Sequence, residues 1–175
     1  MHFNNIIDFQ TLIGLSDVKS LPVFFYVQKN EGVWWGSEGD NKIPFELTRL
    51  NIGGAMNASS GIFTAPRNGI YSFAFSGLGW FPISSNRTYI TLALELNGNQ
   101  VGRTLTVTND DDSFYTLSLD STLELKTGDR VWMRLVWASY NKLYDDGDHY
   151  THFVGHLLQE KVANSLKHLA RKREG

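Results

Sequence analysis

Two runs of aspartate are the residues of this chain best suited to hold a metal ion. The first run is Asp110, Asp111 and Asp112, and the second is the segment 145–148, which has three aspartates around a glycine. Hard cations such as calcium take several carboxylate or carbonyl oxygens as ligands, but neither run has the spacing of an EF-hand. The residues alone therefore leave two interpretations open, namely calcium-binding loops or acidic loops in solvent.

The histidines and the absence of cysteine argue against a catalytic centre. Without cysteine the chain has no disulfide, thiolate metal site or cysteine nucleophile. On a strand, the side chains of His152 and His156 would lie about 13 Å apart, too far to share one metal ion. No Gly-x-Ser-x-Gly turn, phosphate-binding loop or dinucleotide fingerprint is present. We therefore expect that the protein is not an enzyme.

Two sequons offer sites for covalent modification. Asn57 begins Asn-Ala-Ser and Asn86 begins Asn-Arg-Thr, and both triplets match the acceptor pattern for N-glycosylation. Both asparagines fall between expected strands, where a glycan has room. We predict glycans at Asn57 and Asn86 if the chain enters the secretory pathway.

Composition limits the classes of protein to which the chain can belong. Its 175 residues fit one domain, and 42% are hydrophobic, which argues against disorder. The net charge of −2 lacks the positive surplus that a phosphate backbone attracts, so we expect no nucleic-acid partner. No apolar run approaches the length of a membrane span. The segment 1–20 lacks the basic start and unbroken apolar core of a signal peptide.

The middle of the chain reads as β-strands. Several runs alternate apolar and polar residues with period two and are separated by turn signals such as Asn97-Gly98. This spacing indicates a sandwich, barrel or jelly roll. We interpret the aromatic side chains on one strand face as core, and we expect Gly69 to adopt a positive φ in a turn after Asn68. The runs are 22–28, 69–76, 89–96, 115–119, 131–138 and 152–159.

The segment 45–75 resembles the signature of the globular head domain of complement component C1q. The stretch 61–73 resembles the most recognisable part of that family, and segments 128–132 and 153–158 also fit. Met56 departs from the pattern, which usually has an aromatic residue or leucine there. Methionine fills irregular gaps well, so the departure does not disturb the fold. The matching signature residues are Phe45, Asn51, Phe63, Gly69, Tyr71, Phe73 and Phe75.

The resemblance implies a fold and an assembly. It implies an all-β, ten-stranded jelly-roll sandwich, like that of tumour necrosis factor, assembled as a homotrimer. The C1q-like domain would span 21–160, between an N-terminal extension at 1–20 and a basic C-terminal tail at 161–175. The chain contains no Gly-X-Y repeat of a collagen-like stalk.

The resemblance also implies a function without catalysis. We expect a secreted, extracellular binding module of innate immunity that recognises a protein, a glycan or a microbial surface ligand in a lectin-like manner. The alternative is a signalling ligand for a cell-surface receptor. Calcium binding in the family favours Asp110–Asp112 as the metal site. The predicted ligand contacts are the loop aromatics Trp80, Phe81, Tyr140 and Tyr144.

Overall fold

The computed structural model describes residues 21–30, 32–34, 41–84, 86–108, 113–138 and 142–161. Within these ranges the chain forms twelve β-strands and no helix. The strands are β1 (Phe24–Gln28), β2 (Gly32–Trp34), β3 (Leu47–Ile52), β4 (Met56–Asn57), β5 (Ile62–Thr64), β6 (Gly69–Phe81), β7 (Thr88–Leu96), β8 (Asn99–Thr108), β9 (Ser113–Leu125), β10 (Arg130–Ala138), β11 (Lys142–Asp145) and β12 (His152–Glu160). The predicted N-terminal extension and nearly all of the C-terminal tail lie outside the described residues.

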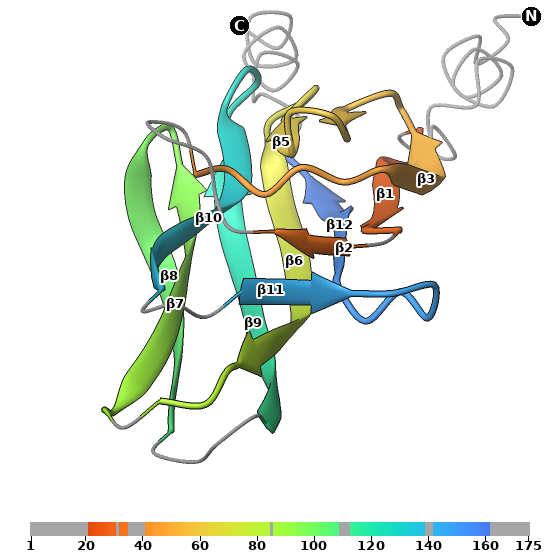
Figure 1. Cartoon of the computed structure of the whole chain (residues 1–175). Coiled ribbons are helices and arrows are strands. Elements are labelled where there is room, and N and C mark those ends of the chain that lie inside the picture. Colours follow the sequence, from red (N-terminus) through yellow and green to blue (C-terminus); the bar gives the residue numbers. More distant parts are fainter. Residues whose placement is uncertain are drawn as a thin grey trace, which may run out of the picture.

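The strands form two antiparallel sheets (Figure 1). The seven-stranded sheet has the order β2-β11-β6-β12-β1-β3, and β9 pairs with the other edge of β6. The five-stranded sheet has the order β4-β5-β10-β7-β8. The predicted all-β jelly-roll sandwich is confirmed. The described residues form twelve strands where the resemblance implies ten, and the short strands β2 and β11 pair with each other beside β6.

Strand β6 is the longest element of the seven-stranded sheet, together with β9. It pairs with β9 over its whole length, from Gly69 opposite Leu125 to Phe81 opposite Ser113. Along its other edge, β12 pairs with the first part of β6 and β11 with the last part. Because side chains alternate along a strand, β6 buries every second residue against the other sheet.

The core between the sheets is rich in aromatic rings. The signature aromatics Phe45, Phe63, Tyr71, Phe73 and Phe75 are all buried, with at most 2% of each exposed. The ring of Phe63 lies 5.4 Å from that of Phe73, edge to face, which is a favourable arrangement for aromatic pairs. These contacts join β5 of one sheet to β6 of the other. Core packing is thus a physical reason for the spacing of the signature aromatics.

Two polar signature positions have different structural roles. The side chain of Asn51 closes the turn between β3 and β4, because its amide donates to the Met56 carbonyl at 2.8 Å and its oxygen accepts from the Met56 N–H at 3.2 Å. Gly69 is not among the glycines with positive φ, so the expected turn conformation is wrong. A Cβ at Gly69 would instead lie 2.5 Å from the Gln159 carbonyl oxygen. The position requires glycine because β12 approaches β6 closely there.

Two turns at one end of the sandwich are tied together by side chains. Asn97 and Gly98 both have positive φ, as a two-residue type I′ hairpin between β7 and β8 requires. The Asn97 amide donates to Asp129 at 2.9 Å, and its oxygen accepts from the Arg130 N–H at 2.8 Å. Asp129 also accepts from the Lys126 N–H at 2.7 Å. We call this network the Asn97–Asp129 latch.

Candidate binding surfaces

The outward face of the seven-stranded sheet carries several apolar and aromatic side chains. Strand β6 turns alternate residues away from the core, and β1, β11 and β12 do the same beside it. These outward side chains are partly exposed, except that Phe114 of β9 is 49% exposed. We call this surface the aromatic sheet face, which comprises Phe24, Tyr26, Ala74, Leu78, Trp80, Phe114, Tyr144, Val154 and His156.

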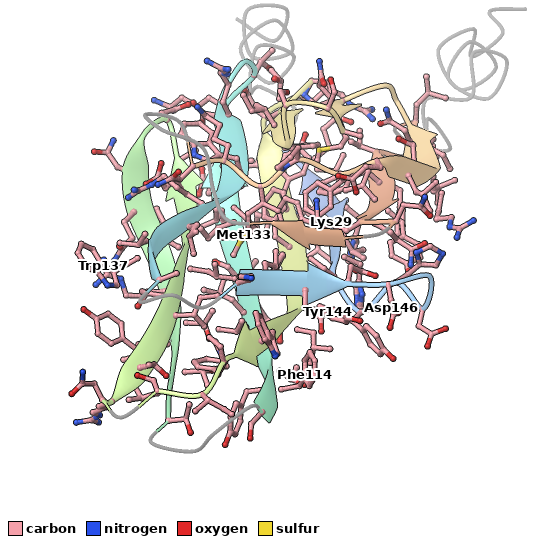
Figure 2. All side chains as sticks on the ribbon, viewed as in Figure 1. Lys29, Phe114, Met133, Trp137, Tyr144 and Asp146 are labelled. Atoms are coloured by element: carbon pink, nitrogen blue, oxygen red, sulfur yellow. The ribbon has the colours of Figure 1, made fainter. Side chains whose placement is uncertain are left out.

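Ring contacts organise both ends of the aromatic sheet face. At one end the Phe24 and His156 rings are stacked with centroids 5.5 Å apart. At the other end the Phe114 and Tyr144 rings meet edge to face at 5.0 Å, and both are labelled in Figure 2. Their strands, β9 and β11, pair with opposite edges of β6, so the two rings meet across the outward face of β6. These contacts hold large rings in fixed positions at the surface. Preformed aromatic surfaces of this kind are enriched at protein interfaces.

The predicted contact aromatics divide into three groups. Trp80 and Tyr144 belong to the aromatic sheet face, and the Lys142 ammonium lies 4.4 Å from the centre of the Trp80 ring. Phe81 is 0% exposed, so the prediction that it contacts a ligand is wrong. Because β6 continues to Phe81, the alternation of the strand turns this ring into the core. Tyr140 lies outside the described residues.

The acidic segment that follows Tyr144 is held by its own hydrogen bonds. Asp145 is buried and accepts from the Thr151 N–H at 2.8 Å, while Asp146 accepts from the Asp148 N–H at 2.9 Å. Partial burial raises the pKa of the Tyr144 phenol, and the nearby Asp146 carboxylate raises it further. Asp145 and Asp146 therefore each accept a backbone hydrogen bond from within this segment.

The metal prediction falls on residues that the structure does not describe. Asp110, Asp111 and Asp112 lie outside the described ranges, so calcium binding there stays a prediction. Among the described residues, no group of three or more His, Asp or Glu side chains lies close enough to hold a metal ion. The sequon asparagines Asn57 and Asn86 are both exposed, and glycans there also remain predictions.

The outward face of the five-stranded sheet has the opposite character, because it concentrates positive charge. Glu95 is the sole acidic residue in its five strands, whereas three arginines occur there. Lys42 joins them through an isolated bridge to β10. We call this surface the cationic sheet face, and its members are Lys42, Arg103, Arg130 and Arg134.

Sequence reasoning missed the most exposed aromatic residue of this second face. The alternation along β10 places Trp137 on the same side as the core residues Met133 and Leu135. A β-bulge between Leu135 and Trp137 breaks that alternation, and Trp137 is 57% exposed. Bulges re-aim side chains in this way, and nothing in a period-two pattern reveals them. Figure 2 shows Trp137 pointing away from the sandwich, and Tyr89 stacks against it with ring centres 6.3 Å apart.

Comparison with known proteins gives the class to which this architecture belongs. The family model of the C1q domain matches residues 22–158. The chain therefore belongs to the C1q domain family, whose members are non-enzymatic binding or signalling modules. No helix among the described residues is long and apolar enough to cross a membrane.

Individual relatives agree with this assignment. Human (Homo sapiens) multimerin-2 is 31% identical over 137 residues, which cover 78% of this chain and 13% of that protein. Human complement C1q tumor necrosis factor-related protein 3 is 31% identical over 124 residues, which cover 71% of this chain and 47% of that protein. The chain thus spans less than half the length of these curated relatives.

Solved structures share the fold at low sequence identity. The globular domain of zebrafish complement 1qA protein superposes with a TM-score of 0.58 at 17% identity, covering 79% of this chain and 99% of that one. The Eiger TNF of S. frugiperda gives 0.63 at 11% identity, covering 83% of this chain and 98% of that one. At these identities the likeness concerns the fold alone.

Proposed function

We propose that the protein is a secreted, homotrimeric recognition head that binds a protein, glycan or microbial surface ligand without catalysis. The observation that carries this proposal is the aromatic sheet face. Half-buried side chains such as Tyr26, Leu78 and Val154 lose more solvent contact when a second copy packs on them. Burial of apolar surface is the main favourable term in association. Membership of the C1q domain family supports the same arrangement.

Trimerisation gives the recognition function a physical advantage. Three copies around one axis present three equivalent sites, and binding by the second and third sites becomes intramolecular. Weak contacts at a single head therefore add up to useful avidity on a repetitive surface. A glycan coat or a microbial surface is repetitive in this sense, which is why we favour it as the ligand.

The experiment that tests this function compares the natural protein with a variant that cannot assemble. Val154 lies opposite Ala74 in the middle of the aromatic sheet face, so Val154→Lys places a charge in the expected seam. We expect the natural protein to bind bacterial surfaces or arrayed glycans in a saturable way, and the variant to bind them at least tenfold more weakly because avidity is lost.

The same assay separates the two functional classes. Saturable binding of the trimer to a single receptor on animal cells, without binding to glycans or bacteria, would contradict the recognition proposal. That result would favour the receptor-ligand alternative, which uses the same scaffold.

A further inference from the structure

The cationic sheet face segregates charge in a chain that is negative as a whole. The net charge of the protein is −2, but the strands of the five-stranded sheet contain Arg103, Arg130 and Arg134 against the single acid Glu95. Glu95 is buried and pairs with Arg134 through a hydrogen-bonded ion pair. The pair neutralises both Glu95 and Arg134, so Arg103 and Arg130 give these strands a local positive surplus. A surface of this kind attracts an anionic partner.

The cations are grouped around one indole ring. The Lys42 ammonium lies 5.1 Å from the centre of the Trp132 ring, and the Arg130 guanidinium lies 5.9 Å from it. The backbone of Lys42 also bridges to that of Arg134 at the sheet edge. Contact with the face of an aromatic ring stabilises a cation in a defined position. Lys42 and Arg130 are therefore ordered around Trp132 and are not independent, solvated side chains.

Strand register places an aromatic platform beside this cluster. Arg134, Ala93 and Arg103 form one cross-strand row, and Trp137, Thr91 and Leu105 form the next outward row. The two rows are separated by two residues along β7, or about 7 Å. In the second row Trp137 is 57% exposed and Leu105 is 56% exposed. Apolar rings and positive groups thus lie within reach of one extended ligand.

The positive end of this face opens into a shallow hollow. Arg130 and Ile62, which contribute to the five-stranded sheet, line an open cavity of about 620 Å³ together with the turn residues Gly53 and Gly54. The β10 strand runs from Arg130 at this hollow to Trp137 at the platform, a span of about 20 Å. The face is therefore an elongated track with cations along it, and not a compact pocket.

From these observations we propose that the cationic sheet face binds an acidic polysaccharide, whose sugar rings carry carboxylate or sulfate groups. The apolar face of a sugar ring packs on Trp137 and Tyr89, and acidic groups on neighbouring sugars pair with the arginines. The planar arginine side chain donates two parallel hydrogen bonds to a carboxylate or sulfate, which is the strong form of such pairing. The inference deepens the proposed recognition function by naming its ligand class, and it rests on that proposal.

The location of the track makes it compatible with assembly. The track belongs to β7, β8 and β10, which lie on the other side of the sandwich from β1 and β12 (Figure 1). A trimer built through the aromatic sheet face therefore leaves three tracks exposed. Their combined binding produces the avidity that the proposed function requires.

The test measures binding of labelled oligosaccharides to the full chain. The probes are a heparin oligosaccharide, which is sulfated, an alginate oligosaccharide, which carries only carboxylates, and neutral maltodextrin. We expect saturable binding of at least one acidic probe, none of maltodextrin, and weaker binding as salt screens the cations. Binding of heparin alone or of alginate alone identifies sulfate or carboxylate as the recognised group, and both results support the inference.

Two variants connect the binding to the track. Arg103→Gln combined with Arg130→Gln removes two cations while leaving the Arg134–Glu95 pair intact, and we expect affinity to fall at least tenfold through lost charge-assisted hydrogen bonds. The matched control, Arg49→Gln with Lys161→Gln, removes the same amount of charge elsewhere. Arg49 lies in β3 of the seven-stranded sheet, and Lys161 directly follows β12. We expect the control variant to bind within about twofold of the affinity of the natural protein, because salt screens charges that lie far from the ligand.

A third variant and a peptide probe distinguish a polysaccharide from an acidic protein. Trp137→Ala should weaken oligosaccharide binding at least fivefold, because the surface on which the sugar ring packs is lost. The variant should still fold, since the removed side chain is exposed. Poly-glutamate should bind weakly and be insensitive to Trp137→Ala. Equal binding of poly-glutamate and sugar, with no effect of Trp137→Ala, would overturn the inference in favour of an acidic protein partner.

The remaining outcomes separate this inference from the proposed function. Equal weakening by the control pair, or no binding of any acidic probe, would also overturn it. The mass of the same samples is measured in parallel. A trimer that binds no acidic sugar contradicts only the ligand class, whereas a monomer that binds one contradicts only the proposed assembly.

Discussion

At the scale of single residues, the Asn97–Asp129 latch explains why polar residues recur at two turns of the sandwich. Asp129 accepts one hydrogen bond from a backbone N–H and one from the Asn97 amide. These donors, the Lys126 N–H first and then Asn97, lower the pKa of Asp129 below its ordinary value of 3.8. The ionised carboxylate is therefore favoured in the folded state, and the latch is strongest when Asp129 is charged.

The latch predicts a pH-dependent effect of Asp129→Asn. An asparagine keeps an acceptor but loses the charge, so we expect the free energy of unfolding to fall by about 0.5–1 kcal/mol at neutral pH, a small loss because solvent screens this exposed site. Because the folded-state pKa of Asp129 is lowered, its contribution is complete above 3.8 and is lost as the pH falls through the folded-state value. Urea denaturation of both proteins should show a gap at pH 7 that closes at lower pH. A gap of constant size would contradict the role of the charge.

Single residues also show how far the sequence predicts the candidate sites. The alternation in β6 correctly places Tyr71, Phe73 and Phe75 in the core. It does not show how far the strand continues, so the sequence predicts Phe81 in a loop although it is buried. Trp137 is missed for a different reason, because a bulge reverses its direction. Both errors concern strand ends or irregularities, which depend on pairing with distant residues.

At the scale of elements, the sequence predicts most strands but not their pairing. The runs at 69–76, 89–96, 131–138 and 152–159 lie within β6, β7, β10 and β12 or coincide with them closely. The sequence does not predict β8 as a separate run. Its outward side includes Arg103 and Leu105, so it lacks a simple apolar and polar alternation. The cationic sheet face could not be foreseen, because it arises when β8 pairs with β7 and β7 with β10.

Because β12 approaches β6 closely, adding a single methyl group at Gly69 is predicted to lower the stability of the fold. A Cβ at Gly69 would lie 2.5 Å from the Gln159 carbonyl oxygen and 2.6 Å from a Leu157 methyl carbon. Since backbone cannot move aside freely, we expect Gly69→Ala to destabilise the fold by about 1–3 kcal/mol, as overpacking does elsewhere. Thermal denaturation gives the measurement.

A matched substitution tests whether that loss comes from the contact. A Cβ at Gly147 would meet no atom within 4 Å, and this glycine has no positive φ. Gly147→Ala should therefore leave the stability within about 0.5 kcal/mol of that of the natural protein. If both alanine variants lose the same stability, the explanation by close strand approach is wrong.

At the scale of the whole molecule, the two sheets have different outward chemistry. The seven-stranded sheet presents half-buried aromatic and aliphatic groups, and the five-stranded sheet presents Lys42 and Arg130 around Trp132. Apolar surfaces suit contact with another copy, whereas charged surfaces suit recognition of an opposite charge. The sandwich thus separates the proposed assembly surface from the proposed ligand surface.

This separation predicts opposite responses to substitutions on the two faces. Val154→Lys, in the middle of the aromatic sheet face, should reduce the mass of the assembly, because a buried unpaired charge is strongly unfavourable. Trp137→Ala, on the other sheet, should leave the mass unchanged. Sedimentation velocity compares the masses of the two variants. If only Trp137→Ala lost its assembly, the subunit contact would lie on the five-stranded sheet, which would contradict the proposed assembly surface. Circular dichroism checks that each variant remains folded.

The most direct test of the central claim is the mass of the natural protein in solution. Light scattering during size-exclusion chromatography at micromolar concentration measures that mass without reference to shape. The proposed homotrimer predicts three times the 19.8 kDa mass of one chain. A single species with the mass of one chain would contradict the assembly through the aromatic sheet face, and with it the avidity on which the proposed function depends.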